Sequence, residues 1–252
     1  MDELYQDHLN RVTRLTLPES YRNVFPSLQA SAKFRNGNPA PFPGYSVITP
    51  PGDPVNAKFM SALTAFQAEL TQAFPESWVM LPSSSFHITV ADLIWAEDYE
   101  ATVSDNPAFE TQLQAAIANV FDEQANRSSN APVIWQSLGI LLRPRAIAVN
   151  LVPENSENYE RVMTLRRAIY QNAHVVDLGI EQQYPYTAHL TLGYLQQPPV
   201  PDKRESLVKL LSRLCDRCLG DLPTFQMNEV QLQKFDNMTH FYRAETWPYL
   251  KF

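Results

Sequence analysis

Two short segments of the chain have the same pattern, and this repeat constrains the fold more than any other feature. The segments are His87-Ile88-Thr89-Val90 and His189-Leu190-Thr191-Leu192, and each reads histidine, apolar residue, threonine, apolar residue. Alternation with a period of two is typical of a half-buried β-strand, on which residues i and i+2 share one face. We therefore predict two strands that each present a histidine and a threonine on one face and bury their apolar residues in a core.

Helices and strands follow a similar order around both motifs. Helical spacing of apolar residues predicts helices over residues 54–74, 107–120, 156–172 and 202–219. Alternating or apolar runs predict strands, including those at 45–49, 78–81, 86–94, 133–142, 146–152, 175–178, 184–187, 188–195 and 224–235. This order predicts a pseudo-duplicated α+β protein whose two lobes face each other and place the two motif strands side by side across a cleft.

The sequence also predicts how the chain is divided into an extension and a domain. Partial helical spacing, interrupted by prolines, indicates an N-terminal helical extension over residues 1–35. No linker rich in glycine or serine separates the two motifs, so residues 36–252 are predicted to form a single domain of two lobes.

Charge and composition exclude several classes of partner. The net charge is −7 and the isoelectric point is about 5.2, which argues against an extended nucleic-acid duplex or an anionic membrane as partner. The first residues lack the basic and apolar regions of a secretory signal, and no apolar run has the length of a membrane span. We expect a cytoplasmic, monomeric protein that binds a small nucleotide or an oligonucleotide.

Two cysteines, Cys215 and Cys218, form a single Cys-x-x-Cys pair late in a predicted helix. A zinc site needs two further ligands, and neither a second such pair nor a nearby histidine supplies them. Both sulfurs lie on the apolar face of the helix, so we interpret the cysteines as small core residues.

Two histidines that face one cleft are suited to proton transfer near neutral pH. The neutral one takes a proton from an attacking hydroxyl or water, and the charged one gives a proton to the leaving oxygen. Threonine hydroxyls on the same faces can donate hydrogen bonds to phosphate oxygens as charge builds on them. This arrangement requires no metal or other cofactor, and the sequence has neither a phosphate-binding loop nor a zinc-protease motif.

The twin motifs and their apolar flanks resemble those of the 2H phosphoesterase superfamily, which includes the LigT-like RNA 2′,3′-cyclic phosphodiesterases. The resemblance covers roughly residues 42–242, and the segments Lys33-Phe34 and Pro41-Phe42-Pro43-Gly44 resemble a less characterised branch. It implies a bilobal α+β fold with antiparallel sheets lining a central cleft and helices outside. The implied substrate is a 2′,3′-cyclic phosphate or a related phosphodiester that ends at a nucleoside.

By the same resemblance, His87 and His189 are the catalytic residues, and Thr89 and Thr191 bind the substrate phosphate. The motifs are nearly symmetric and leave the choice of base open; by analogy we take His189 as the base and His87 as the acid. Two other functions stay open, a nucleotide-binding module that uses the same cleft without turnover and an RNA end-joining ligase. A purely structural role for both histidines is the remaining alternative.

Five further residues are candidates for substrate binding. Arg143 can neutralise phosphate, although a surface or ion-pair role is an alternative for it. Tyr45, Tyr194, Phe241 and Tyr242 can stack against a base, although each can also pack in the core. Tyr194 lies five residues after His189, so an ideal strand places it on the opposite face unless a bulge at Gly193 turns it.

Overall fold

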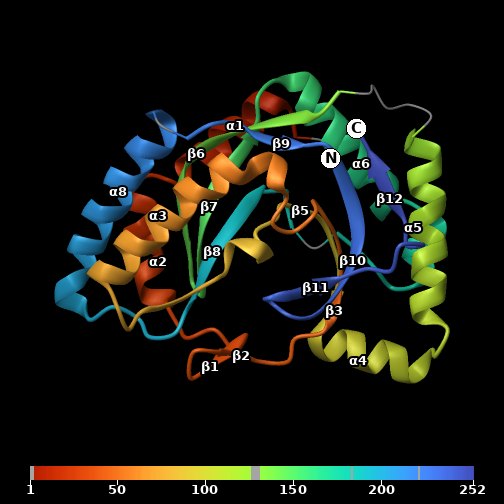
Figure 1. Cartoon of the computed structure of the whole chain (residues 1–252), viewed down its shortest axis with the longest axis horizontal. Helices are drawn as coiled ribbons and strands as arrows, with labels where there is room; N and C mark the ends of the chain where they lie inside the picture. The colour runs from red at the N-terminus through yellow and green to blue at the C-terminus, as the bar shows by residue number, and fades with distance from the viewer. Residues whose placement is uncertain (1–2, 126–130, 183, 221) are drawn as a thin grey trace.

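Two antiparallel sheets face each other across the centre of the molecule, with helices on their outer sides (Figure 1). The computed structural model describes residues 3–125, 131–182, 184–220 and 222–252. One sheet has the strand order β11-β10-β3-β5, with β12 paired to β10, and the other has the order β4-β8-β7-β6-β9. The arrangement confirms the predicted α+β fold with antiparallel sheets and outer helices.

The strands of the first sheet are β3 (Gly44–Ile48), β5 (Thr89–Trp95), β10 (Glu229–Asn237), β11 (His240–Tyr242) and β12 (Tyr249–Lys251). Those of the second are β4 (Trp78–Met80), β6 (Val133–Arg143), β7 (Ala146–Pro153), β8 (His189–Leu195) and β9 (Phe225–Met227). A small hairpin, β1 (Phe34–Arg35) with β2 (Asn38–Pro39), lies apart from both sheets. The two motifs therefore belong to different sheets: Thr89 begins β5 and His189 begins β8.

The helices are α1 (Tyr5–Arg14), α2 (Pro18–Val24), α3 (Ala57–Ala73), α4 (Ala96–Asp105), α5 (Phe109–Ala125), α6 (Ser156–Tyr170), α7 (Ala173–Asp177) and α8 (Arg204–Gly220). Helices α3 and α8 cover the sheet that contains β8, and α5 and α6 lie on the side of the sheet that contains β5 (Figure 1). The four long helices predicted from apolar spacing correspond to α3, α5, α6 and α8. Asp53 accepts a hydrogen bond from the backbone N–H of Val55 and so begins the turn that leads into α3.

Two predicted strands are wrong, and a third, at 224–235, is broken at Asn228 into β9 and β10, which belong to different sheets. Residues 175–178 fall largely in α7, because the Asn172 side chain accepts the backbone N–H groups of His174 and Val175 and so begins a helix. Residues 184–187 form no strand: Arg11 binds the carbonyl of Tyr186 in place of a neighbouring strand. Helix α4 was not predicted; it begins at Ala96, where a φ of 54° turns the chain sharply out of β5.

Both helices of the N-terminal segment, α1 and α2, pack against the second sheet. Val12 of α1 and Tyr21 of α2 are fully buried, and their contacts include a hydrogen bond from Tyr21 Oη to the carbonyl of Ile140. The division into an extension at 1–35 and a domain at 36–252 stays a prediction.

The two cysteines of α8 lie in this same part of the core. Both are buried free thiols, and the Cys215 sulfur accepts the backbone N–H of Ile140. The predicted role of Cys215 and Cys218 as core residues is confirmed.

Candidate active site

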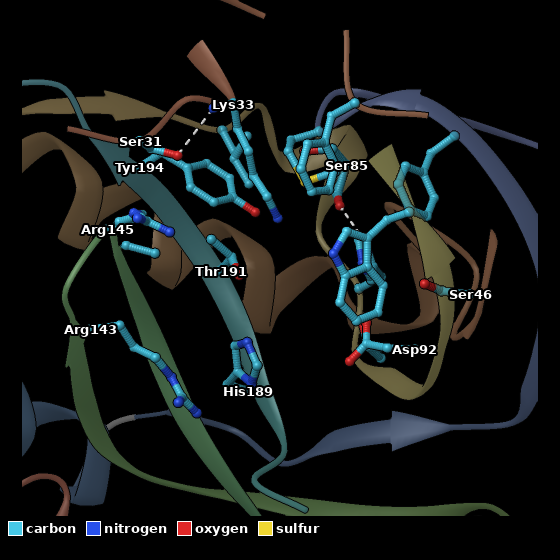
Figure 2. Close-up of a pocket in the computed structure, with 18 of the residues that line it drawn as sticks. Ser31, Lys33, Ser46, Ser85, Asp92, Arg143, Arg145, His189, Thr191 and Tyr194 are labelled. Carbon is cyan, nitrogen blue, oxygen red and sulfur yellow. Dashed lines mark hydrogen bonds between the residues drawn. The ribbon is translucent and has the colours of Figure 1, made fainter. Parts of the chain in front are cut away.

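A cavity of about 750 Å³ lies where the two sheets face each other, and both motifs contribute to its wall (Figure 2). The lining residues from the side of β5 include His87, Thr89 and Asp92, and those from the side of β8 include His189, Thr191 and Tyr194. The structure thus brings together the two His-x-Thr pairs that the sequence separates by about a hundred residues.

His87 lies just before β5, in a segment that buried neighbours hold in place. Phe86 and Ile88 are almost fully buried on either side of it. Thr49, just after β3, donates its backbone N–H to the carbonyl of Ile88 and accepts the N–H of Ile88 on its side-chain oxygen. The apolar positions of the motif thus anchor the backbone and leave the imidazole at the cavity wall.

His189 is fixed in an equivalent way at the start of β8. Ala188 and Leu190 are buried on either side of it, and Leu151 of β7 donates its backbone N–H to the carbonyl of Ala188. His189 itself pairs with Asn150 in the register of β7 and β8. The two histidines are therefore held by backbone pairing rather than by flexible loops.

The two imidazoles make the same hydrogen bond. Nδ1 of His87 lies 2.7 Å from the carbonyl oxygen of Ser85, and Nδ1 of His189 lies 2.8 Å from the carbonyl oxygen of Thr187. A carbonyl oxygen only accepts, so each Nδ1 must be the protonated nitrogen. In the neutral form each Nε2 then has a free lone pair, which can accept a proton, and in the charged form it has a proton to give.

The surroundings of both histidines favour the neutral form of the imidazole. Burial lowers the pKa of His87 to about 4, against the bond to Ser85, which raises it. Burial also lowers the pKa of His189, and the positive charge of Arg143 lowers it further. An anionic phosphate between the two rings favours the charged form, so it restores a proton to one of them.

Bulges in the two strands decide which other side chains face the cavity. In β5, Asp92 pairs with Ser46 while Thr89 pairs with Ile48, so one extra residue separates Thr89 from Asp92. In β8, Gly193 pairs with Ile147 while Thr191 pairs with the next residue, Ala148. Each bulge moves the residue three places after the motif threonine onto the face of that threonine.

Tyr194 reaches the cavity through the second of these bulges. The sequence prediction made its exposure to the cleft conditional on a bulge at Gly193, and the register shift lies between Thr191 and Gly193. Asp92 reaches the cavity in the same way and was missed. A single carboxylate within the apolar run from Ile88 to Ile94 was the signal that could have identified it.

Of three other candidates, one lines the cavity and two do not. Arg143 is exposed at the end of β6 and lines the cavity near His189 (Figure 2). Tyr45 is fully buried behind the sheet and packs against Tyr99 and Trp247. Tyr242 donates a hydrogen bond to Asp236 and is not part of the cavity wall. The structure therefore places Tyr45 and Tyr242 away from the cavity wall, because Tyr45 packs among aromatic rings behind the sheet and Tyr242 pairs with Lys234 at the edge of the sheet.

Phe241, a further candidate for base stacking, lines the cavity, together with two aromatic residues and a lysine that were not predicted. The Phe241 ring meets the His87 ring edge to face, with 4.5 Å between their centroids. Phe42 and Trp95 also line the cavity, and Lys33 extends into it (Figure 2). Lys33 and Phe42 come from the segment around the β1–β2 hairpin, which has no alternation to mark it as part of a site.

The described residues were also considered as a possible metal site and as a possible membrane span. No group of three or more histidine, cysteine, aspartate or glutamate side chains among them is arranged to hold a metal ion. None of the helices in the described ranges is both long enough and apolar enough to cross a membrane.

Comparison with known proteins relates the first motif to a known family and the fold to solved structures. Residues 33–135, which include the first motif, match the model of the family 2H-phosphodiest, described as a domain of unknown function (DUF1868). A conserved protein of unknown function from Agrobacterium tumefaciens has a similar structure, with 19% identity, a TM-score of 0.60, and 86% of this chain and 92% of that chain covered. E. coli LigT, solved in complex with 3′-AMP, aligns with 15% identity and a TM-score of 0.42 over 84% of this chain and 95% of its own. The search of curated proteins found no match.

Proposed function

We propose that this chain, whose residues 33–135 match the 2H-phosphodiest family model, is a metal-independent phosphodiesterase of the 2H phosphoesterase superfamily that uses His87 and His189 as a general acid and a general base. The proposed substrates are nucleoside 2′,3′-cyclic phosphates and short oligonucleotides. The acidic net charge favours such a small ligand over a long RNA, whose binding depends on many phosphate contacts.

The observation that carries this proposal is the matched pair of histidine tautomers. Each Nδ1 donates to the carbonyl oxygen of the residue two places before it, at 2.7 and 2.8 Å, and so each Nε2 is the nitrogen left to exchange protons with a ligand. One structural histidine with this bond would be unremarkable. Two of them from different sheets, both lining one cavity and both followed by a threonine in that cavity, support a shared chemical task.

In the proposed reaction a water molecule attacks the phosphorus while the neutral histidine, His189 by analogy, takes a proton from it. The bond from phosphorus to the leaving ribose oxygen breaks, and the charged histidine, His87, protonates that oxygen. For a cyclic phosphate the product is a phosphomonoester, and proton exchange with solvent restores the starting state. The hydroxyls of Thr89 and Thr191 donate to the non-bridging oxygens, and Arg143 offsets their charge.

The direct test is turnover of a substrate panel in excess EDTA. The panel holds the four nucleoside 2′,3′-cyclic monophosphates and short 2′,5′- and 3′,5′-linked oligonucleotides, with product analysis by chromatography. Hydrolysis that survives EDTA supports the proposal and identifies the substrate class. Recovery of bound but unchanged nucleotide for every member would instead support the nucleotide-binding module, and joining of RNA ends would support the ligase. Activity that EDTA abolishes and added metal restores would contradict the metal-independent mechanism.

A further inference from the structure

We propose that Lys33 is a third phosphate-binding group of this cavity, acting beside the two threonines. This inference rests on the proposed function, since it assigns a further residue to the same site. Lys33 lies at the base of the β1–β2 hairpin, outside both motifs, and its side chain points into the cavity (Figure 2).

The backbone around Lys33 is tied to the strand that carries the second motif. Ser31 donates its backbone N–H to the carbonyl of Leu195 at the end of β8, at 2.7 Å. The carbonyl of Lys33 in turn accepts the N–H of Ala40, which closes the hairpin and brings Phe42 back toward the lysine. The position of the lysine is thereby set relative to His189 and Thr191.

Aromatic rings hold the ammonium group without using its hydrogen bonds. The Nζ atom lies 4.3 Å from the ring centroid of Phe42 and 5.2 Å from that of Tyr194. A cation above a ring face is attracted by the ring quadrupole, but its N–H groups need oxygen or nitrogen acceptors to be satisfied. Among the described residues no hydrogen bond or ion pair of this ammonium is found. Its three donors are therefore available to a ligand.

The charge of Lys33 acts on both catalytic histidines. It contributes to the lowered pKa of His87 and to that of His189, so its charge acts on both motifs. A ligand whose reacting phosphorus lies between the imidazoles places its non-bridging oxygens within reach of the same ammonium. A preorganised cation at that point stabilises the negative charge that grows on those oxygens during the reaction.

A lysine that binds phosphate differs from a purely structural lysine because its effect on activity depends on its charge, and therefore on pH. Burial lowers the pKa of Lys33 to about 8, with Asp92 acting in the opposite direction. The other titratable or charged groups around the cavity are His87, His189, Arg143, Arg145, Tyr184 and Tyr194. Burial raises the pKa of both tyrosines and lowers that of both histidines, so Lys33 is the group that loses its charge just above neutral pH.

The experiment compares wild type with Lys33→Met, Lys33→Arg and Arg35→Met. Arg35 is an exposed cation of the same hairpin that does not line the cavity, so its variant controls for loss of charge alone. We expect Lys33→Met to lower kcat/KM by about 10²-fold and Lys33→Arg to recover most of it. The ratio of wild type to Lys33→Met should fall as pH rises through about 8, because wild type loses the ammonium charge there, whereas both histidines, with their lowered pKa values, titrate at lower pH.

A binding measurement separates failure of this inference from failure of the proposed function. Inorganic phosphate, compared with sodium chloride at equal ionic strength, should raise the unfolding temperature of wild type, Lys33→Arg and Arg35→Met but not of Lys33→Met. The same result without turnover of any substrate overturns the hydrolytic function and keeps the inference. Three outcomes would overturn the inference about Lys33. These are equal phosphate stabilisation of wild type and Lys33→Met, no phosphate stabilisation of wild type, and undiminished turnover by Lys33→Met.

Discussion

At the scale of single residues, the two histidines make the same kind of hydrogen bond and lie in similar electrostatic environments. Each Nδ1 faces a backbone carbonyl, and burial disfavours the charged form of both rings. A buried neutral imidazole keeps its lone pair for proton abstraction, and an anionic ligand supplies the negative charge that lets a partner ring hold a proton. In the proposed mechanism the ligand itself thus completes the acid–base pair.

The lowered pKa of His87 also predicts how stability depends on pH. Below its ordinary pKa of 6.5 the unfolded chain binds a proton at this residue, whereas the folded protein does so only near pH 4. Stability is therefore lost as pH falls through this interval, by about 2–3 kcal/mol for this group. The free energy of unfolding of wild type, relative to His87→Asn, should fall between pH 6.5 and 4 in urea titrations. A difference that is constant across this interval would contradict the assignment.

The motif threonines give a second prediction at this scale. Thr89→Val and Thr191→Val keep the shape of the side chain but remove its hydroxyl donor, so each should lower kcat by about 10²-fold in steady-state assays of the substrate found with the panel. Thr111→Val, at an exposed position of α5, is the matched control and should leave kcat unchanged. Full activity of both motif variants would exclude the threonines from phosphate binding.

At the scale of elements, the bulges in β5 and β8 turn Asp92 and Tyr194 toward the cavity, which an ideal strand would not do. Strand β8 tolerates its bulge because Gly193 leaves room for β4: an added Cβ would lie 2.7 Å from the carbonyl oxygen of Val79 and 2.9 Å from the sulfur of Met80. Strand β4 must therefore move if residue 193 acquires a side chain, and Tyr194 must move with it.

We expect Gly193→Ala to lower the free energy of unfolding by about 1–3 kcal/mol and to reduce kcat/KM through displacement of Tyr194. Gly220→Ala is the control, since nothing lies within 4 Å of an added Cβ at the end of α8. Thermal unfolding and steady-state kinetics of both variants check this. Equal unfolding temperatures for Gly193→Ala and Gly220→Ala would show that the close contact between Gly193 and β4 does not limit which side chain the protein tolerates at this position.

The sequence predicts the elements of this fold better than it predicts the composition of the cavity wall. Apolar spacing identifies the long helices and both motif strands, because these patterns arise directly from burial of one face. Asp92 and Tyr194 depend on bulges, which are fixed by pairing with β3 and β7 and have no local signature. Lys33 depends on a loop position, and the helix at α7 depends on a single cap by Asn172.

At the scale of the whole molecule, the N-terminal helix is connected to the segment that precedes His189. Arg11 of α1 donates to the side-chain oxygen of Thr187 at 3.0 Å and to the carbonyl of Tyr186 at 2.6 Å. The carbonyl of Thr187 is the acceptor for His189, and the hydroxyl of Tyr186 donates to the carbonyl of Thr89. One short segment therefore joins α1, His189 and the first motif strand.

Arg11→Met should loosen this segment without unfolding the protein. We expect a loss of about 1–2 kcal/mol of stability and a decrease in kcat of about 10-fold or more, since small displacements of a catalytic group cost much of its rate. Arg14→Met, at an exposed position of the same helix, should show neither effect. Chemical denaturation and initial-rate kinetics distinguish these outcomes, and a fully active Arg11→Met would show that α1 does not position His189.

The central claim is that His87 and His189 each transfer one proton. The measurement that tests it most directly is kcat of His87→Ala and His189→Ala on the substrate that wild type hydrolyses in excess EDTA, with nucleotide affinity measured in parallel. We expect kcat to fall by about 10²–10⁴-fold in each variant, while each variant still binds nucleotide. Turnover near the wild-type rate in either variant would contradict it.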